Sequence, residues 1–378
     1  MTLAFLPPPR PLRIVVLGLS ITSSWGNGHA TTYRSLLRGL RRRGHTTLFL
    51  ERDAPWYAAN RDPVEPECGP VHLYGGLDEL HGRWRPTLES ADLVIVGSYV
   101  ADGIAVAGLV RSLATGVAAF YDIDTPVTLA GLAAGDCPYL DAATVPLFDL
   151  YLSFTGGPAL RLLETRYGAR AARVLYCAVD PDRHRPQPLP KTWDLGYLGT
   201  YSEDRQPAVE RLLCEPARRR PERRFVVAGP LYPADLAWPP GVERIEHVGP
   251  DAHAGFYSRQ RFTLNLTRAD MARMGYSPSV RLFEAAACGV PVISDWWPGL
   301  DTIFTPGEHI LIARSAEDVL SHLCLGEDER RQLARRARAH VLNHHTAMHR
   351  AQMLEQYVED LVGDDRRSGE PLAAAALR

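Results

Sequence analysis

The sequence has almost no lysine and no excess of charge of either sign. Lys191 is the only lysine in 378 residues, although lysine and arginine together number 42. Its basic groups are therefore arginines, whose planar guanidinium groups suit bidentate binding of phosphate or carboxylate. The formal net charge of −2 provides no global basic field for nucleic acid. We therefore expect no nucleic-acid partner.

The sequence also lacks paired cysteine motifs and long apolar runs. Its six cysteines are scattered and form no CxxC pair, which is typical of buried thiols in a reducing compartment. No apolar run approaches the ~18 residues that a membrane span needs, and the first residues lack the apolar core of a signal peptide. We expect a cytoplasmic location, and peripheral membrane contact remains open.

Short buried-strand patterns alternate with helical patterns along the whole chain. This alternation predicts parallel sheets with right-handed crossovers. The strand patterns lie at residues 13–20, 46–51, 92–97, 116–122 and 149–154, and again at 194–200, 224–230, 261–267, 289–295 and 309–314. The prolines between Pro181 and Pro190 separate the two series, because proline disfavours helix and cannot donate to a ladder.

The predicted fold class is α/β, with two Rossmann-like doubly wound domains facing a cleft. We expect a first domain at 1–182, a second domain at 183–345, a helix at 346–363 that returns to the first domain, and a disordered tail at 364–378. Ligands of such sheets bind beyond the carboxyl ends of the strands. Functional residues are therefore expected in the loops that follow strands.

The segment SPSVRLFEAAACGVPVISD has a carboxylate, Glu284, inside a small and apolar helical pattern. Ser277 is a good N-cap, and the free N–H groups of Ser279 and Val280 at the helix start are suited to a phosphate. Glu284 would lie on the order of 9 Å further along the helix, where a carboxylate can accept bonds from ribose hydroxyls. The alternative is that Glu284 pairs with Arg281, one turn away.

Two arginines follow strands of the second domain. Arg205 comes after the loop GTYSED, and Arg268 comes directly after RFTLNLT. Both are candidates to stabilise the charge of a diphosphate leaving group. The alternative is that they are ordinary surface arginines.

Two strand-end loops of the first domain are candidates to contact an acceptor. WGNGHATTY places Gly26 and Gly28 around Asn27, with His29 at the start of the next helix as a possible base. The loop does not match GxGxxG, which argues against a dinucleotide oxidoreductase. A tight turn with a helix-capping histidine is the other interpretation.

The second loop, YDIDTP, presents Asp122 and Asp124 on one face of an extended chain. Either carboxylate is a candidate to orient or deprotonate an acceptor hydroxyl. A metal-binding Asp-x-Asp pair, as in single-domain GT-A glycosyltransferases, is the alternative that the two-domain strand count disfavours.

The segment from Ser277 to Phe304 resembles the nucleotide-sugar-binding segment of GT-B glycosyltransferases. YRSLLRGLRRRGHTTLFLERDAPWY, CAVDPDRHRP and WDLGYLGTYSEDRQP extend the resemblance over most of the chain. It is greatest to bacterial spore-maturation-type (CgeB-like) proteins, relatives of the retaining family 4. Many family 4 enzymes carry a donor-facing Glu eight residues before Glu284, where this chain has Tyr276.

The resemblance implies metal-independent transfer of a sugar from a nucleoside-diphosphate sugar to an acceptor hydroxyl, with no cofactor and no bound metal. It also implies that the domain at 1–182 binds the acceptor and that the domain at 183–345 binds the nucleotide sugar. The acceptor class stays open among saccharide, lipid, small molecule and protein, and the oligomeric state is open too. A non-hydrolysing sugar-nucleotide epimerase and a non-catalytic sugar-nucleotide-binding protein are the alternatives. Tyr276 favours the second of these, and it leaves retention or inversion unassigned.

Overall fold

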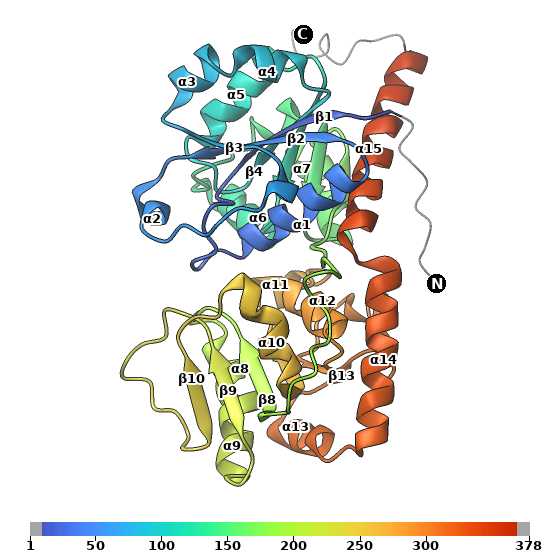
Figure 1. Cartoon of the computed structure of the whole chain (residues 1–378). Helices are drawn as coiled ribbons and strands as arrows, with labels where there is room; N and C mark the ends of the chain where they lie inside the picture. The colour runs from blue at the N-terminus through green and yellow to red at the C-terminus, as the bar shows by residue number, and fades with distance from the viewer. Residues whose placement is uncertain (1–9, 369–378) are drawn as a thin grey trace. The chain divides into compact units, whose positions relative to one another are not determined.

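The structure is a computed structural model that describes residues 10–368, with side chains described up to residue 363. It divides into two compact units. Unit 1 comprises residues up to Cys177 together with those from Ala347 onward, and unit 2 comprises Ala178–Thr346. Figure 1 labels most of the helices and strands of each unit.

Unit 1 contains a seven-stranded, entirely parallel sheet in the order β3-β2-β1-β4-β5-β6-β7. Every residue of β4 and β5 is buried, because helices cover both faces of such a sheet. All five strands predicted for this part are present; the two additional strands are short edge strands with weaker apolar patterns. The strands are β1 (Arg13–Gly18), β2 (Thr46–Arg52), β3 (Val71–Tyr74), β4 (Leu93–Gly97), β5 (Val117–Asp122), β6 (Leu150–Ser153) and β7 (Ala172–Val174).

The C-terminal helix α15 (Ala347–Ser368) packs on α1 (Gly28–Arg42) within unit 1 (Figure 1). Gly39 of α1 permits this approach, since a Cβ there would lie 2.5 Å from the carbonyl oxygen of Ala347. Arg43 and His45 hold the buried carboxylate of Glu355, with 2.6 Å between His45 Nε2 and Glu355 Oε1. The remaining helices of unit 1 are α2 (Pro55–Ala58), α3 (Leu77–Gly82), α4 (Arg85–Ser90), α5 (Gly103–Leu113), α6 (Thr125–Ala134) and α7 (Pro158–Tyr167).

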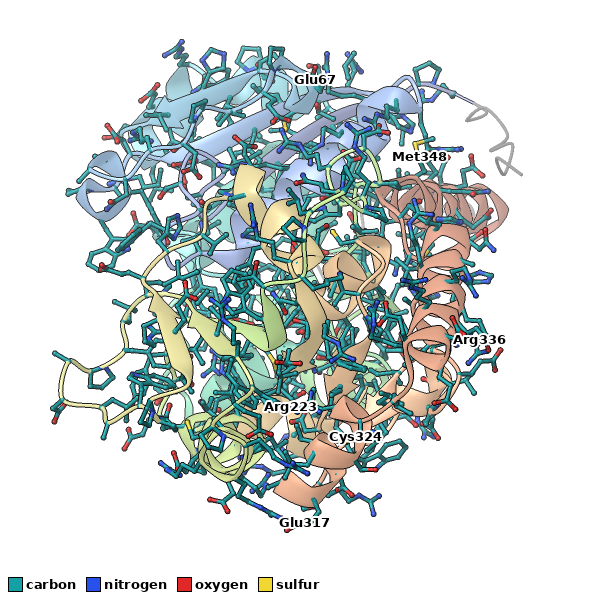
Figure 2. All side chains as sticks on the ribbon, turned by 60° about the horizontal axis from the view of Figure 1, so that its bottom comes forward. Glu67, Arg223, Glu317, Cys324, Arg336 and Met348 are labelled. Atoms are coloured by element: carbon teal, nitrogen blue, oxygen red, sulfur yellow. The ribbon has the colours of Figure 1, made fainter. Side chains whose placement is uncertain are left out.

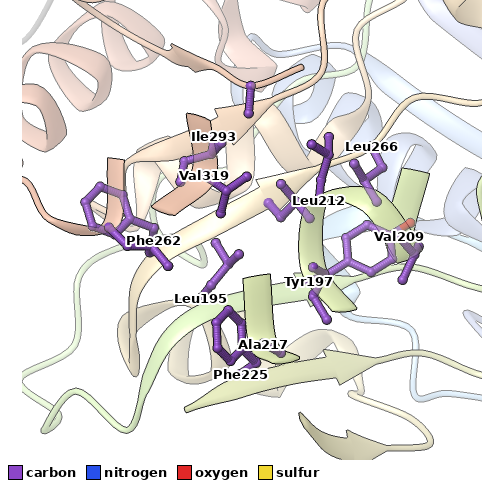
Figure 3. Close-up of a cluster of buried hydrophobic side chains, with 14 of the residues drawn as sticks. Leu195, Tyr197, Val209, Leu212, Ala217, Phe225, Phe262, Leu266, Ile293 and Val319 are labelled. Atoms are coloured by element: carbon purple, nitrogen blue, oxygen red, sulfur yellow. The ribbon is translucent and has the colours of Figure 1, made fainter. Parts of the chain in front are cut away.

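Unit 2 repeats the architecture with a six-stranded parallel sheet in the order β10-β9-β8-β11-β12-β13. Its core packs side chains of β8, β9 and β11, including Leu195, Phe225 and Phe262, against the helices on one face (Figure 3). The five predicted strands are again present, and the edge strand β10 was not predicted. The strands are β8 (Trp193–Leu198), β9 (Phe225–Ala228), β10 (Val242–Ile245), β11 (Gln260–Asn265), β12 (Val292–Ser294) and β13 (Leu311–Ile312).

The helices of unit 2 include one π-helical turn, Glu210–Cys214, between α8 and α9. Such turns are rare and occur mostly as single insertions in α-helices. The α-helices are α8 (Gln206–Val209), α9 (Glu215–Arg219), α10 (His253–Ser258), α11 (Ala269–Met274), α12 (Val280–Ala287), α13 (Ala316–Leu323) and α14 (Glu327–His344).

The division between the units differs by a few residues from the predicted one. The chain leaves unit 1 after Cys177, where a boundary was expected at 182, and returns to it at Ala347. The segment expected to form a tail begins inside α15, which runs to Ser368. Residues 369–378 lie outside the described residues.

All six cysteines are free thiols. Four of them are buried, whereas Cys324 is exposed and lies beside Arg223, whose guanidinium is 3.9 Å from the sulfur (Figure 2). Among the described residues, no helix has both the length and the apolarity to cross a membrane.

Candidate functional site

Each sheet has one point at which the strand order reverses. In unit 1 this point lies between β1 and β4, and in unit 2 it lies between β8 and β11. The crevice beyond the carboxyl ends of two such strands is where open α/β sheets bind ligands. Most of the predicted site residues lie in the loops that follow these strands or their neighbours.

The loop after β1 brings His29 to the start of α1. Asn27 is the N-cap: its side-chain oxygen accepts a hydrogen bond from the His29 backbone N–H at 3.1 Å. Its amide nitrogen donates to the carbonyl of Ser23 at 2.9 Å, and Gly26 supplies a left-handed turn with φ of 60°. Asn27 is therefore the capping residue, and the alternative of a capping His29 was wrong.

His29, Tyr99 and Asp124 form one cluster in unit 1. The Nε2 atom of His29 lies 3.5 Å from Oδ2 of Asp124, with side-chain exposures of 11% and 21%. The Tyr99 ring packs edge-on against His29 at 5.4 Å. Burial, followed by the charge of Asp124 and a hydrogen bond to it, raises the pKa of Tyr99, and Tyr99 has a left-handed φ of 62° that is costly for a non-glycine residue.

The structure buries Asp122 completely. Its carboxylate accepts hydrogen bonds from the Tyr151 hydroxyl at 2.6 Å and from Thr128 Oγ1 at 2.7 Å. Burial raises its pKa to about 6, although both hydrogen bonds act in the opposite direction. A carboxylate enclosed in this way does not face an acceptor, so the catalytic role predicted for Asp122 is not supported. Its neighbour Asp124 occupies the accessible position.

Arg205 and Arg268 lie on either side of Asp204 in unit 2. Arg268 Nε is 3.7 Å from Asp204 Oδ2, and Arg205 donates to the carbonyl of Thr200 at 2.8 Å. Burial disfavours the ionised form of Asp204, but hydrogen bonds from Ser202 and the Ala269 backbone, and then the charges of the two arginines, lower its pKa. The Nε atoms of both arginines are buried without a hydrogen-bond partner among the described residues. The pair therefore has donors left for an additional anion.

The helix α12 begins two residues later than predicted. Its N-cap is Ser279, whose backbone is extended, and its first helical residue is Val280. Ser277 is buried, and its hydroxyl donates to the carbonyl of Gly275 at 3.1 Å, so the N-cap predicted at Ser277 was wrong. The free N–H groups at the helix start therefore begin at Val280.

Arg281 fixes the start of α12 to the switch point of its own sheet. Its Nε donates to the carbonyl of Leu198 at the end of β8 at 2.6 Å, and its Nη1 donates to Asn265 Oδ1 at the end of β11 at 2.8 Å. The guanidinium also lies 4.9 Å from the centre of the Tyr197 ring. These contacts replace the pairing with Glu284 that was considered from the sequence.

Tyr276 lies in a strained turn before α12. Its φ is 51°, and its N–H donates to the carbonyl of Pro298 at 2.7 Å. Its ring covers Gly299, where a Cβ would lie 2.4 Å from the ring and where φ is 87°. This residue stands where family 4 has its donor-facing Glu, and it supplies an aromatic ring in place of a carboxylate.

Glu284 is buried within unit 2, with 2% of its surface exposed. Its Oε1 atom lies 3.3 Å from His184 Nε2, while its Oε2 atom lies 3.5 Å from His253 Nδ1 and 3.1 Å from the Tyr257 hydroxyl. Burial alone would raise the pKa of Glu284, but the charges of the two histidines hold it well below its usual value. In this arrangement both carboxylate oxygens face side chains of the same unit, and the predicted ribose role stays a prediction.

The sequence interpretation missed several members of these clusters. Tyr99 follows β4, and Asn265 ends β11, so both satisfy the strand-end criterion that selected the other residues. Asp204 precedes Arg205 directly. His184 and His253 carried no local signal, because their relation to Glu284 exists only in the folded unit.

Residues 205–356 match the family model described as "Glycosyl transferase-like". No curated protein matches the chain. The chain is similar in structure to a sucrose-phosphate synthase from Thermosynechococcus elongatus, with 14% identity, a TM-score of 0.66, and coverage of 93% of this chain and 100% of that one. It is also similar to HepE from Anabaena in complex with UDP and glucose, with 13% identity, a TM-score of 0.69, and coverage of 92% and 100%.

A third similar structure is an alpha-glucosyltransferase in complex with UDP-glucose and DNA, with 11% identity, a TM-score of 0.69, and coverage of 92% and 100%. These likenesses establish the fold over nearly the whole chain, and the matched segment covers most of unit 2. The narrower resemblance to spore-maturation-type proteins stays a prediction. Residues 205–356 are thus glycosyl transferase-like, and the two doubly wound units share the fold of these glycosyltransferase structures.

Proposed function

We propose that the protein transfers a sugar from a UDP-linked donor to an acceptor hydroxyl, with unit 2 binding the donor and unit 1 binding the acceptor. The observation that carries the donor half is the pair Arg205 and Arg268, whose buried Nε donors have no hydrogen-bond partner among the described residues. They lie at the switch point of unit 2, in the segment that matches the glycosyl transferase-like family.

The donor's diphosphate is assigned to these arginines and to the start of α12. The N–H of Val280 lies at the first turn of that helix, where unsatisfied N–H groups and the helix dipole favour an anion. Arg281 holds this helix start to the ends of β8 and β11, so the anion site is fixed in advance. UDP is proposed as the carrier because HepE and the alpha-glucosyltransferase are complexes with UDP or UDP-glucose.

The acceptor is assigned to the cluster of His29, Tyr99 and Asp124. One ring nitrogen of His29 faces Asp124, and the other, Nδ1, has no hydrogen-bond partner among the described residues. This ring can take the proton of an acceptor hydroxyl while Asp124 stabilises the charge that develops on it. The glycines Gly26 and Gly28 of the same loop leave open space beside their Cα atoms.

In the proposed reaction the acceptor oxygen forms a bond to the anomeric carbon of the sugar. The bond from that carbon to the phosphate oxygen breaks, and its electron pair leaves with UDP. Arg205, Arg268 and the helix start stabilise the charge that accumulates on the diphosphate. The acceptor proton moves to His29.

Tyr276 motivates a second candidate, a protein that binds the sugar nucleotide without turnover. The family 4 carboxylate that faces the donor sugar is absent at this position, and the ring of Tyr276 packs on Gly299. An epimerase is the third candidate. Incubation with UDP-sugar alone separates it from the transferase, because an epimerase changes the sugar without an acceptor.

Calorimetric titration of the whole chain with UDP, GDP and dTDP in the presence of a chelator tests the donor site. We expect specific binding of UDP, and we expect Arg205→Ala and Arg268→Ala each to weaken it by about 10- to 100-fold, since a hydrogen bond to a charged group contributes roughly 1.5–3 kcal/mol.

Arg336→Ala is the matched control. This arginine lies on α14 of the same unit, and its side chain contacts the carbonyl of Glu308 (Figure 2). Its removal should leave UDP affinity unchanged. Equal affinity in wild type and in both switch-point variants would refute the donor assignment. UDP-sugar binding without transfer to any acceptor in a broad panel would favour the non-catalytic candidate.

A further inference from the structure

Three side chains that are far apart in the sequence converge inside unit 2. His184 comes from the proline-rich segment before β8, His253 is the first residue of α10, and Glu284 lies on α12. Each offers one ligand atom, and these atoms all lie within 4.8 Å of one another. Among the described residues, no other group of three or more histidine, cysteine or carboxylate side chains meets this criterion.

Two separations within this cluster are longer than those of good hydrogen bonds and close to those between two ligand atoms of one metal ion. His184 Nε2 and His253 Nδ1 lie 3.3 Å and 3.5 Å from the two Glu284 oxygens. Good hydrogen bonds of this kind are about 2.7–2.9 Å long. Ligand atoms placed about 2.0–2.2 Å from Zn²⁺ in a tetrahedron are about 3.3–3.5 Å apart.

The polar atoms of the cluster also lack other partners. His184 Nδ1, His253 Nδ1 and Glu284 Oε1 are buried, and none has a hydrogen-bond partner among the described residues. Burial of the Glu284 charge requires a compensating charge or a metal, and the partners of this carboxylate among the described residues are the two histidines and the Tyr257 hydroxyl. A divalent cation between the three side chains would compensate this charge.

One neighbour orients the carboxylate of the cluster. The Tyr257 hydroxyl donates to Glu284 Oε2 at 3.1 Å and so helps to fix its position. Metal-bound carboxylates generally have such an additional hydrogen-bond partner.

We propose that His184, His253 and Glu284 form a zinc-binding site that ties the proline-rich segment before β8 to α10 and α12. Two histidines and one glutamate are a ligand set of Zn²⁺ sites in which three protein ligands leave one position open. The site departs from the expectation of a chain without metal, and it gives Glu284 a role other than the predicted ribose contact. It shares no residue with the arginines assigned to the donor. Its expected role is to hold these three segments together.

Metal uptake by the intact protein tests the proposal directly. The whole chain is stripped with a chelator, freed of the chelator, and titrated at pH 7.5 with Zn²⁺ and, separately, with Co²⁺ as a coloured probe, without nucleotide. We expect one equivalent of Zn²⁺ by elemental analysis, a rise in Tm on loading, and the intense visible absorption of tetrahedral Co²⁺. Because no cysteine belongs to the site, no sulfur-to-cobalt charge-transfer band should appear.

The variants His184→Gln, His253→Gln and Glu284→Gln test which residues bind the ion. Each should weaken Zn²⁺ binding by more than about 100-fold, because even outer partners of a metal ligand typically contribute roughly 10- to 100-fold. The control is His309→Gln, which alters another histidine cluster of unit 2, where His309 stacks on His340 at 4.3 Å. This control should retain one equivalent.

Two results would overturn the proposal. The first is a folded wild-type protein, as judged by its unfolding transition, that takes up no stoichiometric Zn²⁺. The second is uptake that persists in His184→Gln or His253→Gln while it falls in His309→Gln. The UDP affinity of the metal-free wild type, measured in parallel, distinguishes failure of the zinc proposal from failure of the donor proposal. If the metal-free chain still binds UDP, the donor assignment holds whatever the result for zinc.

Discussion

The switch points of the two units have the same strand arrangement but different side chains around them. In unit 1, the loops after β1, β4 and β5 bring together an imidazole, a phenol and the carboxylate of Asp124. In unit 2, the loops after β8 and β11 bring two guanidinium groups, those of Arg205 and Arg268, near Asp204. A parallel sheet with this strand order provides only the place for a ligand, and the loop residues decide which charge the ligand carries. The comparison predicts separable effects: variants of unit 1 should change turnover, and variants of unit 2 should change nucleotide affinity.

The largest effect is expected for His29→Ala. A positioned general base typically contributes about 10²- to 10⁴-fold to rate, so kcat should fall by that factor. Calorimetric affinity for UDP should not change, because His29 belongs to unit 1 and the donor residues belong to unit 2. A similar loss of UDP affinity would contradict the assignment of the acceptor to unit 1 and of the donor to unit 2.

The substitution Arg268→Glu replaces a guanidinium group at the switch point of unit 2 by a carboxylate, the kind of group found at the switch point of unit 1. It removes one donor and places a carboxylate beside Asp204, whose Oδ2 lies 3.7 Å from Arg268 Nε. The affinity for UDP should fall on the order of 100-fold, with a weaker dependence on salt concentration than in the wild type. Binding isotherms at two ionic strengths measure both quantities, and an affinity within threefold of the wild type would contradict the assignment.

Asp122→Asn tests whether this carboxylate is structural. Its pKa is raised to about 6 in the folded state. The folded state therefore holds the proton over a pH range in which the unfolded state has lost it, so the wild type loses stability as pH rises toward and through 6. Asparagine cannot ionise, so the variant should gain roughly 2 kcal/mol relative to the wild type between pH 4.5 and 7.5.

Urea unfolding of both proteins at the two pH values measures this difference, and the other titrating groups cancel in the comparison. A constant difference would show that Asp122 titrates as an exposed carboxylate, which would restore it as an acceptor-facing candidate.

The smallest effect is expected for Tyr99→Phe. The change keeps the ring that packs on His29 at 5.4 Å and removes the hydroxyl that hydrogen-bonds to Asp124. Loss of one such bond costs about 1 kcal/mol, so kcat should fall about fivefold with an unchanged UDP affinity. An effect as large as that of His29→Ala would show that the phenol itself takes part in proton transfer.

Strand existence was predictable because each long strand is a continuous apolar run. The runs at Arg13–Gly18 and Val117–Asp122 are buried on both faces of their sheet. The missed strands β3, β7 and β10 are short and partly exposed, so their patterns do not differ from those of loops. The start of α12 was placed two residues early because Ser277 and Ser279 are equally good N-caps by sequence.

Burial distinguishes the candidate site residues from residues that are enclosed by their own unit. Asp122 and Asp124 differ by two positions, and nothing in YDIDTP indicates which of them is enclosed by Tyr151 and Thr128. Arg205, Arg268 and Arg281 are all strand-end or helix-start arginines, and only the structure shows that Arg281 uses its donors on Leu198 and Asn265.

The sequence by itself determined the two doubly wound units and the loops in which the functional residues lie, because hydrophobic periodicity and strand-end position are local properties of the chain. The tertiary structure alone decided the environment of each polar group. His184, His253 and Glu284 are separated by 69 and 31 positions, yet their ligand atoms lie within 4.8 Å of one another. Contacts of this kind arise from the packing of distant segments, and no local pattern records them.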